Sequence, residues 1–438
     1  MPRYLHSLPC RETIMRLMQT KQLFRAIAVA APLFCGLTGN AAETNAWKFS
    51  FGAATILFNG KAIDPILDYR KTIGFGFEPG VKGVFIDRAS DDGAFTSDRP
   101  FYFSVALPEG NYKVTVKFGG NEHGSTNTVK SELRRLMLEK IVTAPGKFET
   151  RTFAVNVRTP KISGGGEVHL KDREKTSEIW NWDEKLTLEF NGTQPSLCTL
   201  DIERADGIPT VYLLGDSTVC DQPSEPWNSW GQMLPRFFTP AVAIANHAES
   251  GETLKSALGA RRLDKVLSTM KPGDYLFIQF GHNDMKDRST NVVAAYKSNL
   301  KKFVAGTKEK GGIPVLVTSM ERKTGVDHDT LGEFPATVRE VAKEENVALI
   351  DLHAMSRTLY NAFGQQLDKA FQDGTHHKNY GSYELAKCII EGIKANKLGL
   401  AKFIADDFGS FDPSHPDPVE SFTMPASPGS IGARPLGD

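Results

Sequence analysis

Four short segments of this sequence carry residue types that could together perform acyl transfer. A serine hydroxyl becomes a nucleophile when an imidazole takes its proton, and a carboxylate can orient that imidazole. Since serine, asparagine, aspartate and histidine all occur in these segments, we expect one site with Ser217 as the nucleophile. The segments are Gly215-Asp216-Ser217-Thr218, Glu249-Ser250-Gly251-Glu252, Gly281-His282-Asn283-Asp284 and Asp373-Gly374-Thr375-His376-His377.

Each segment also has an explanation without catalysis. Asp216 and Ser217 could form a turn and cap a helix, as Asp and Ser often do. Asp373 and His376 could form a surface ion pair. The positions of the segments argue otherwise, because three follow apolar runs typical of strands and the fourth precedes the last predicted helix. Four such coincidences in the correct order favour a hydrolase.

The apolar runs that precede these segments do not alternate with polar residues. Such runs indicate strands covered on both faces, and helix-like stretches between them indicate parallel crossovers. We therefore expect residues 208–400 to form a doubly wound α/β domain with a five-stranded parallel sheet and a site at the carboxyl ends of the strands. The expected strands are Thr210–Leu214, Val242–Ala245, Tyr275–Phe280, Pro314–Thr318 and Ala348–Leu352. The expected helices are Ser229–Phe238, Thr253–Met270, Val292–Lys310, Thr337–Glu344 and Tyr380–Lys394.

Residues 46–205 follow a different pattern, in which apolar and polar residues alternate between turn sequences. Alternation predicts strands with one buried face, which suits an antiparallel β-sandwich. One exception is Ser131–Lys140, where Leu133, Leu136 and Met137 could line a short helix. No group of acids, bases or nucleophiles stands out in this region. The expected strands are Trp47–Phe51, Phe101–Leu107, Tyr112–Phe118, Thr152–Val157, Glu167–Leu170, Lys185–Phe190 and Leu197–Ile202.

The first 42 residues have the order of a secretory signal peptide. Basic residues precede an apolar run at 26–37, and small residues follow it. The run is shorter than the roughly 20 residues that a membrane-spanning helix needs. Cys35 could mark a lipid anchor, but the bulky Phe34 before it disfavours that alternative. We expect the protein to be secreted or periplasmic.

The composition of the chain gives no sign of nucleic-acid binding or of a cofactor. The 438 residues include 52 Lys and Arg and 52 Asp and Glu, so a net charge of zero gives no electrostatic argument for nucleic-acid binding. No phosphate-binding glycine loop or dinucleotide fingerprint is evident, and we expect no cofactor. Residues 401–438 are rich in Pro and Gly and predict an extended or disordered tail. The cysteines, which we expect to be buried or free thiols, are Cys10, Cys35, Cys198, Cys220 and Cys388.

The four segments resemble the conserved blocks of the SGNH (GDSL-type) hydrolase superfamily. Within it, the stretch Val211–Trp230 and the segments around Asn283 and His376 look like rhamnogalacturonan acetylesterases. The resemblance covers residues 209–396 and implies a three-layer, flavodoxin-like α/β fold. More loosely, Leu107–Tyr112 resembles the β-sandwich (galactose-binding-like) domains that precede such esterases in bacteria.

The resemblance also implies a role for each site residue. His376 would be the base for Ser217, and Asp373 would orient its ring. The oxyanion of the tetrahedral intermediate would receive hydrogen bonds from the backbone N–H of Ser217, the backbone N–H of Gly251 and the side-chain amide of Asn283. No residue is expected to bind a metal.

Several residues compete for these roles. Asp216 adjoins the serine, but adjacent side chains on an extended segment point to opposite sides, so we expect it to hold the turn. His377 is a rival base, and the resemblance favours His376. Where many relatives have arginine after the glycine, this chain has Glu252, which puts nearby sugar contacts in doubt. For four aromatic residues near the site we favour core packing over sugar stacking; they are Trp227, Trp230, Tyr380 and Tyr383.

The sequence thus predicts a secreted carbohydrate esterase that removes O-acetyl groups from pectic rhamnogalacturonan. One alternative keeps the same triad and acts on another acetylated glycan, such as xylan or peptidoglycan, or on a lipid ester. A second alternative is a catalytically inactive glycan-binding protein. A weaker third is a metal hydrolase that uses Asp373, His376 and His377.

Overall fold

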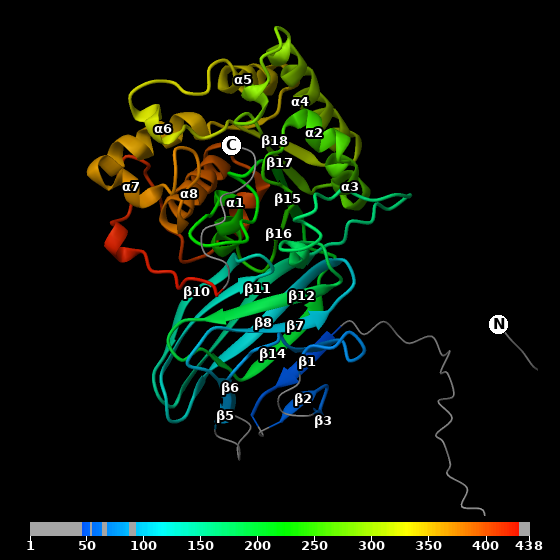
Figure 1. The fold of residues 1–438 in the computed structure, drawn as a ribbon, viewed down its shortest axis with the longest axis vertical. Coiled ribbons are helices and arrows are strands. Elements are labelled where there is room, and N and C mark those ends of the chain that lie inside the picture. The colour runs from blue at the N-terminus through cyan, green and yellow to red at the C-terminus, as the bar shows by residue number, and fades with distance from the viewer. Residues whose placement is uncertain (1–45, 53–54, 64–67, 87–92, 429–438) are drawn as a thin grey trace, which may run out of the picture. The chain divides into compact units, whose positions relative to one another are not determined.

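The computed structural model describes residues 46–52, 55–63, 68–86 and 93–428. The expected signal peptide and Cys35 lie outside these residues. Strands β1 to β14 form antiparallel sheets, and strands β15 to β19 form a parallel sheet with helices around it (Figure 1). The predicted fold class, an α/β domain preceded by an antiparallel β region, is confirmed.

The antiparallel region contains two large sheets that share one core. One sheet has the order β11-β8-β14-β1-β2-β3 and the other the order β10-β9-β12-β7-β4, with a smaller sheet β13-β6-β5 beside them. Phe49 of β1 and Phe103 of β7 meet edge to face across this core, with ring centroids 5.3 Å apart. Phenylalanines dominate the core because each buries a large apolar surface. The strands are β1 Ala46–Ser50, β2 Ile56–Phe58, β3 Lys61–Ile63, β4 Phe75–Phe77, β5 Val84–Ile86, β6 Ala94–Thr96, β7 Phe101–Ala106, β8 Gly110–Gly120, β9 Ser125–Ser131, β10 Arg135–Thr143, β11 Lys147–Val157, β12 Lys185–Asn191, β13 Ser196–Leu197 and β14 Thr199–Arg204.

Two expectations for this region are wrong. The helix expected at Ser131–Lys140 is instead the end of β9, a tight turn in which Glu132 and Arg134 adopt positive φ angles, and the first part of β10. Leu136 belongs to the core beneath the parallel sheet and Met137 to the core of the antiparallel sheets, so both faces of β10 are buried here and the alternation disappears. The strand expected at Glu167–Leu170 is a loop with one isolated bridge.

The parallel sheet has the strand order β16-β15-β17-β18-β19, which is the predicted doubly wound topology. Its strands are β15 Thr210–Gly215, β16 Ala243–Asn246, β17 Tyr275–Gln279, β18 Ile313–Val317 and β19 Ala348–Ile350. The helices are α1 Trp230–Met233, α2 Leu254–Gly259, α3 Arg262–Thr269, α4 Val292–Glu309, α5 Phe334–Glu345, α6 Leu352–Phe363, α7 Leu367–Ala370 and α8 Asn379–Ala395, and the 3-10 helix η2 covers Leu234–Phe237. The stretch expected as one helix at Thr253–Met270 is divided into α2 and α3 at Arg261, whose φ of 61° ends the helical geometry.

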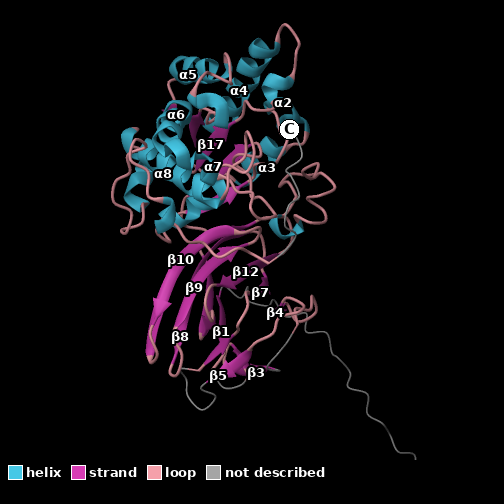
Figure 2. Ribbon diagram, turned by 60° about the vertical axis from the view of Figure 1, so that its left-hand side comes forward, coloured by secondary structure: helices cyan, strands magenta, loops and turns pink. Residues whose placement is uncertain are grey.

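The parallel sheet lies between two layers of helices (Figure 2). Alternate side chains of its strands belong to two different cores, one on each face of the sheet. Val211 and Leu213 of β15 pack with residues of α1, α6 and α8. Tyr212 and Leu214 pack with residues of α2, α3, α4 and α5. Strands buried on both faces explain the unbroken apolar runs of the sequence.

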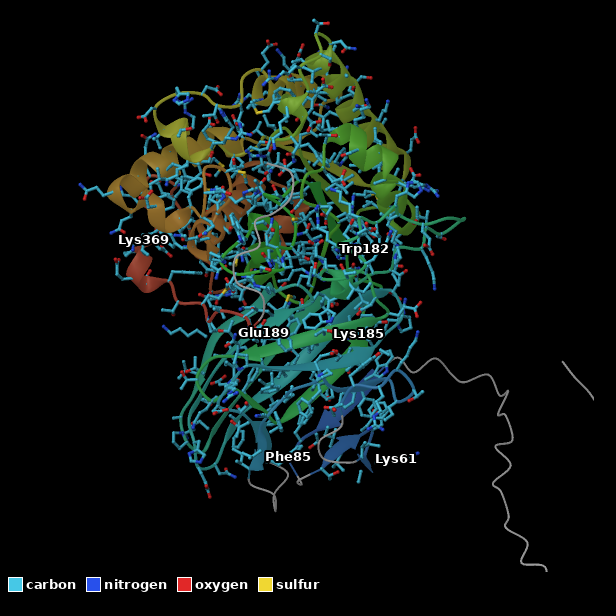
Figure 3. The ribbon with its side chains drawn as sticks, viewed as in Figure 1. Lys61, Phe85, Trp182, Lys185, Glu189 and Lys369 are labelled. Atoms are coloured by element: carbon cyan, nitrogen blue, oxygen red, sulfur yellow. The ribbon has the colours of Figure 1, made fainter. Side chains whose placement is uncertain are left out.

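Buried charges join the antiparallel strands to the α/β domain. Strand β10 packs against α1 and η2, and β11 against β16. In the turn before β10, Arg134 binds Glu225 at 2.6 Å and donates to the carbonyls of Gln222 and Trp227, each at 3.0 Å. Trp182, Lys185 and Glu189 lie at the end of the antiparallel region that meets the helices (Figure 3).

The Pro-rich segment after residue 400 is extended, and through residue 428 it packs on the rest of the chain. Phe408 and Phe422 lie against the core beneath the parallel sheet. Further along, Ser427 donates to Glu189 at 2.7 Å and accepts from the buried Lys130 at 2.7 Å. The segment therefore contacts both the α/β domain and the antiparallel sheets.

Two further features concern the described residues as a whole. Cys198, Cys220 and Cys388 are buried, and Cys220 and Cys388 are free thiols, as expected. Among the helices of the described residues, none combines the length and the apolar character needed to cross a bilayer.

The buried contacts of Arg134 predict a large loss of stability on substitution. Arg134→Met removes the nearest cation of the buried Glu225 and the donor to two buried backbone carbonyls, so the free energy of unfolding should fall by about 3–5 kcal/mol in a urea titration. Arg151→Met is the matched control, because Arg151 and Glu149 form an exposed pair on β11. Its cost should stay below about 1 kcal/mol, and equal effects of the two substitutions would contradict the prediction.

Candidate active site

Ser217 lies in a tight turn directly after β15, the second strand in the order of the parallel sheet. Gly215 is required there, because an added Cβ would lie 2.7 Å from the carbonyl oxygen of Gln279 on β17. The carboxylate of Asp216 accepts hydrogen bonds from the Thr218 N–H at 3.0 Å and from its hydroxyl at 2.7 Å. Asp216 therefore shapes the turn, as expected, and the Ser217 side chain is left to face another partner.

That partner is His376. Its Nε2 lies 2.9 Å from Ser217 Oγ, and its Nδ1 lies 2.9 Å from the Asp373 carboxylate. Asp373 also accepts a hydrogen bond from the His376 N–H at 2.6 Å and one from the Thr375 N–H at 2.7 Å. The short spacing between Asp373 and His376 is thus accommodated by a compact loop before α8. Three residues from two distant segments form one continuous line of hydrogen bonds.

The electrostatics of Asp373 suit a residue that stays ionised. Burial alone would raise its pKa, but hydrogen bonds from the His376 ring and from the backbone N–H groups of His376 and Thr375 hold the pKa below its ordinary value. A carboxylate beside Nδ1 keeps the imidazole proton on that nitrogen, so Nε2 can accept the proton of the Ser217 hydroxyl.

His377, the rival base, faces the opposite way. Its Nε2 lies 2.8 Å from the Tyr360 hydroxyl, and its ring packs against Phe371. This orientation also prevents His377 from joining Asp373 and His376 around a single metal ion.

The three expected oxyanion donors lie on the loops that follow β15, β16 and β17. Gly251 has a φ of +75°, a conformation that favours glycine. The side-chain amide of Asn283 donates to the carbonyl of Glu252 at 3.2 Å, so it lies against the Gly251 loop. Within the described part of the chain, the backbone N–H groups of Ser217 and Gly251 have no hydrogen-bond acceptor. Both N–H groups are therefore available to a substrate oxygen.

Glu252, the departure from the resemblance, points away from solvent. Its carboxylate binds Lys171 at 2.8 Å and lies 3.5 Å from Arg262 Nε. Since the Glu252 side chain is 1% exposed, it cannot contact a bound sugar. Lys171 and its neighbour Arg173 were not expected near the site, and nothing in their local sequence indicates it.

Three of the four aromatic residues near the site are packing residues, as favoured. Trp230 donates to Gln279 at 2.8 Å, Tyr380 to the Asp417 carbonyl at 2.6 Å, and Tyr383 to Glu139 at 2.7 Å. Trp227 differs, because its ring meets the His376 ring edge to face at a centroid distance of 5.5 Å. It therefore supports the imidazole directly.

Two other places could be considered for a ligand. Among the described residues, Glu321, Asp329 and His353 bring ligand atoms within 4.8 Å of one another. Arg339 can only donate, so its contact with His353 Nδ1 at 3.2 Å leaves the ring proton on Nε2, facing Glu321 at 3.1 Å. This arrangement is a hydrogen-bond network in which both ring nitrogens of His353 are engaged, and it does not fit a metal site.

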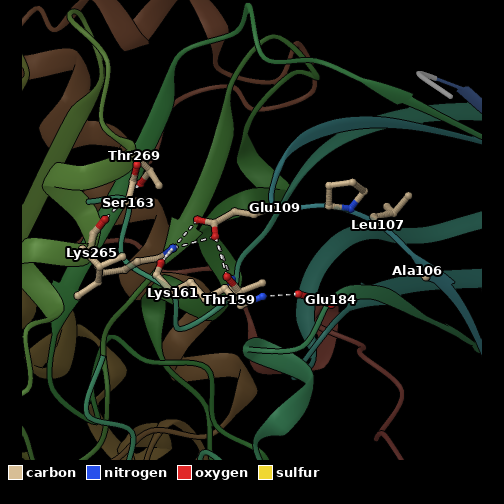
Figure 4. Close-up of a pocket in the computed structure, with 11 residues that line it drawn as sticks. Ala106, Leu107, Glu109, Thr159, Lys161, Ser163, Glu184, Lys265 and Thr269 are labelled. Carbon is tan, nitrogen blue, oxygen red and sulfur yellow. Dashed lines mark hydrogen bonds and ion pairs between the residues drawn. The ribbon is translucent and has the colours of Figure 1, made fainter. Parts of the chain in front are cut away.

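A pocket of about 670 Å³ lies between the turn after β7 and helix α3 (Figure 4). The buried Lys265 crosses its wall and donates to both oxygens of Glu109 at 2.6 and 2.8 Å. No residue of the Ser217 site lines it.

The buried His377 predicts a pH-dependent stability. Burial lowers its pKa to about 3, whereas the unfolded chain protonates histidine near pH 6.5. The unfolded state therefore binds more protons, and stability falls as the pH drops from 6.5 toward 3. His377→Gln should reduce the slope of unfolding free energy against pH by up to about 1.4 kcal/mol per pH unit. Urea titrations between pH 4 and 6 measure it, and the exposed His328→Gln is the control. An unchanged slope in His377→Gln would show the prediction to be wrong.

Comparisons with known proteins identify relatives of this chain. The model of the GDSL-like Lipase/Acylhydrolase family matches residues 213–382. Rhamnogalacturonan acetylesterase RhgT of Bacillus subtilis is 37% identical over 212 residues, which cover 43% of this chain and 90% of that protein. The uncharacterized esterase YxiM of the same organism is 25% identical over 391 residues, covering 83% of this chain and 94% of that protein. The crystal structure of YxiM aligns at 23% identity with a TM-score of 0.45, covering 81% of this chain and 99% of that chain. With most of RhgT matched at this identity, the chain belongs to the GDSL-like lipase/acylhydrolase family, whose members are SGNH hydrolases.

Proposed function

We propose that this protein is a carbohydrate esterase that removes O-acetyl groups from pectic rhamnogalacturonan. The observation that carries the proposal is the line of hydrogen bonds from Ser217 through His376 to Asp373. The choice of substrate is supported by the similarity to RhgT, which is named a rhamnogalacturonan acetylesterase.

The proposed reaction has two halves. Ser217 Oγ attacks the acetyl carbonyl while its proton moves to His376 Nε2, and the resulting imidazolium is stabilised by Asp373. The tetrahedral intermediate then collapses, the bond to the sugar oxygen breaks, and His376 gives the proton to that oxygen. Water, activated by the same histidine, attacks the acetyl-enzyme and releases acetate.

The negative oxygen of each tetrahedral intermediate needs fixed donors. We assign these to the N–H groups of Ser217 and Gly251 and to the amide of Asn283. Preorganised donors of this kind stabilise charge that develops only in the transition state, and one of them is worth about 10²- to 10³-fold in kcat.

We also propose that residues 1–42 direct export of the protein. A pectic polymer is met outside the cytoplasm, so a secretory leader fits the proposed substrate. A basic flank, a short apolar run and small residues support this proposal.

Acetate release from acetylated rhamnogalacturonan is the direct test of the substrate. The purified protein should release acetate from this polymer faster than from acetylated xylan, and Ser217→Ala should lower the rate by on the order of 10⁴-fold or more. Release from xylan alone would change the substrate but keep the esterase. No release from any acetylated glycan would overturn the proposal.

The two adjacent histidines provide an internal comparison. His376→Gln removes the base and should slow labelling of Ser217 by an organophosphonate by on the order of 10⁴-fold. His377→Gln should label at close to the wild-type rate at pH 7.5, because His377 faces Tyr360. Mass spectrometry of the Ser217 peptide gives both rates, and the reverse order would assign the base to His377.

A further inference from the structure

A short segment between β11 and β12 contacts the Gly251 loop. The Lys171 Nζ donates a hydrogen bond to the carbonyl oxygen of Ser250 at 2.6 Å. The guanidinium of Arg173 donates to the same oxygen at 2.5 Å. Two cations from one part of the chain therefore meet a single carbonyl 77 to 79 residues away.

This carbonyl belongs to the peptide unit whose N–H comes from Gly251. In a trans peptide the C=O and N–H groups point in opposite directions within one plane. Two charged donors on the Ser250 oxygen therefore fix the direction of the Gly251 N–H. They also polarise the peptide, because a hydrogen bond accepted by the C=O strengthens the N–H as a donor.

Both cations are themselves held in place. Arg173 Nε donates to Glu249 at 2.7 Å, and Lys171 binds Glu252 at 2.8 Å. The backbone N–H of Lys171 donates to Glu174 at 2.9 Å, and Glu174 binds Arg262 through both its oxygens at 3.0 and 2.6 Å. The surrounding carboxylates thus orient the two side chains toward the Ser250 oxygen.

The loop is also connected to the turn of the proposed nucleophile. The Gln222 side-chain amide donates to the carbonyl of Ser217 at 2.6 Å and lies 3.5 Å from the Ser250 hydroxyl. A shift of the Ser250–Gly251 peptide would therefore alter the position of one proposed donor relative to Ser217.

We propose that Lys171 and Arg173 are positioning residues of the oxyanion hole, supplied by the segment that precedes β12. They act through the Ser250–Gly251 peptide and do not touch the substrate. The inference rests on the proposed function, because it gives the Gly251 N–H its role. It also gives the antiparallel region a part in catalysis.

The test compares Lys171→Met, Arg173→Met and Arg173→Lys with the wild-type protein on a soluble acetyl ester. Each methionine variant should lower kcat by about 10- to 100-fold, less than deletion of a donor, and leave KM within about twofold. Arg173→Lys keeps a cationic donor and should recover part of the loss. The pH profile of kcat should keep its midpoint, because His376 is not altered.

Lys175→Met is the matched control. Lys175 lies in the same segment, is 58% exposed and pairs only with the exposed Asp172 among the described residues. It should behave as wild type. Thermal melts of all variants identify any that fail to fold. If one methionine variant fails, the other methionine variant and Arg173→Lys carry the test.

Two results would overturn the inference. Wild-type kcat in both methionine variants would show that the peptide needs no cations. A raised KM with unchanged kcat would show that Lys171 and Arg173 bind the substrate. The proposed function fails separately, when the wild-type protein releases no acetate. In that case the rate at which a phosphonate labels Ser217 still decides the inference, because this reaction develops negative charge in the same oxyanion hole. The rate should fall in the two methionine variants and stay at the wild-type value in Lys175→Met.

Discussion

The candidate site depends on one constraint of parallel sheets, which is that all strands end at the same edge. Strand β15 pairs with β16 on one side and β17 on the other, so the loops after these three strands are neighbours. Ser217 follows the middle strand, Gly251 follows one neighbour and Asn283 the other. The turn that carries Ser217 approaches β17 so closely that it requires Gly215, and the carboxylate of Asp216 stabilises this turn. The loop before α8 then supplies the two remaining residues of the site, His376 and Asp373.

Much of this arrangement could be predicted from the sequence, because the physical signals were local. Each of the five parallel strands overlaps its predicted run, since burial on both faces leaves few polar residues in a strand. The line from Ser217 to His376 and Asp373 joins residues that had been predicted as one group from their types and order. Helix α6 was not predicted, because its start at Leu352 lies inside the apolar run assigned to the strand before it.

The rest could not be predicted, because it depends on contacts between distant parts of the chain. Leu136 and Met137 serve two different cores, so the pattern of β10 resembles a helix. Lys171 and Arg173 lie in a loop of ordinary charged composition. Only the folded chain brings them to Ser250. The same holds for Glu252, because its role as a buried partner of Lys171 is evident only once the two residues are neighbours.

The extended C-terminal segment limits how this protein could recombine with others. Ser427 lies between Lys130 and Glu189 of the antiparallel sheets, and its backbone N–H donates to Glu225 beside the site at 3.1 Å. A hydrolase module separated from the antiparallel sheets would lose these hydrogen bonds and expose charged side chains that are now buried. Moving the catalytic region of this chain into another protein with these contacts intact would therefore require the antiparallel sheets and the segment through residue 428 as well.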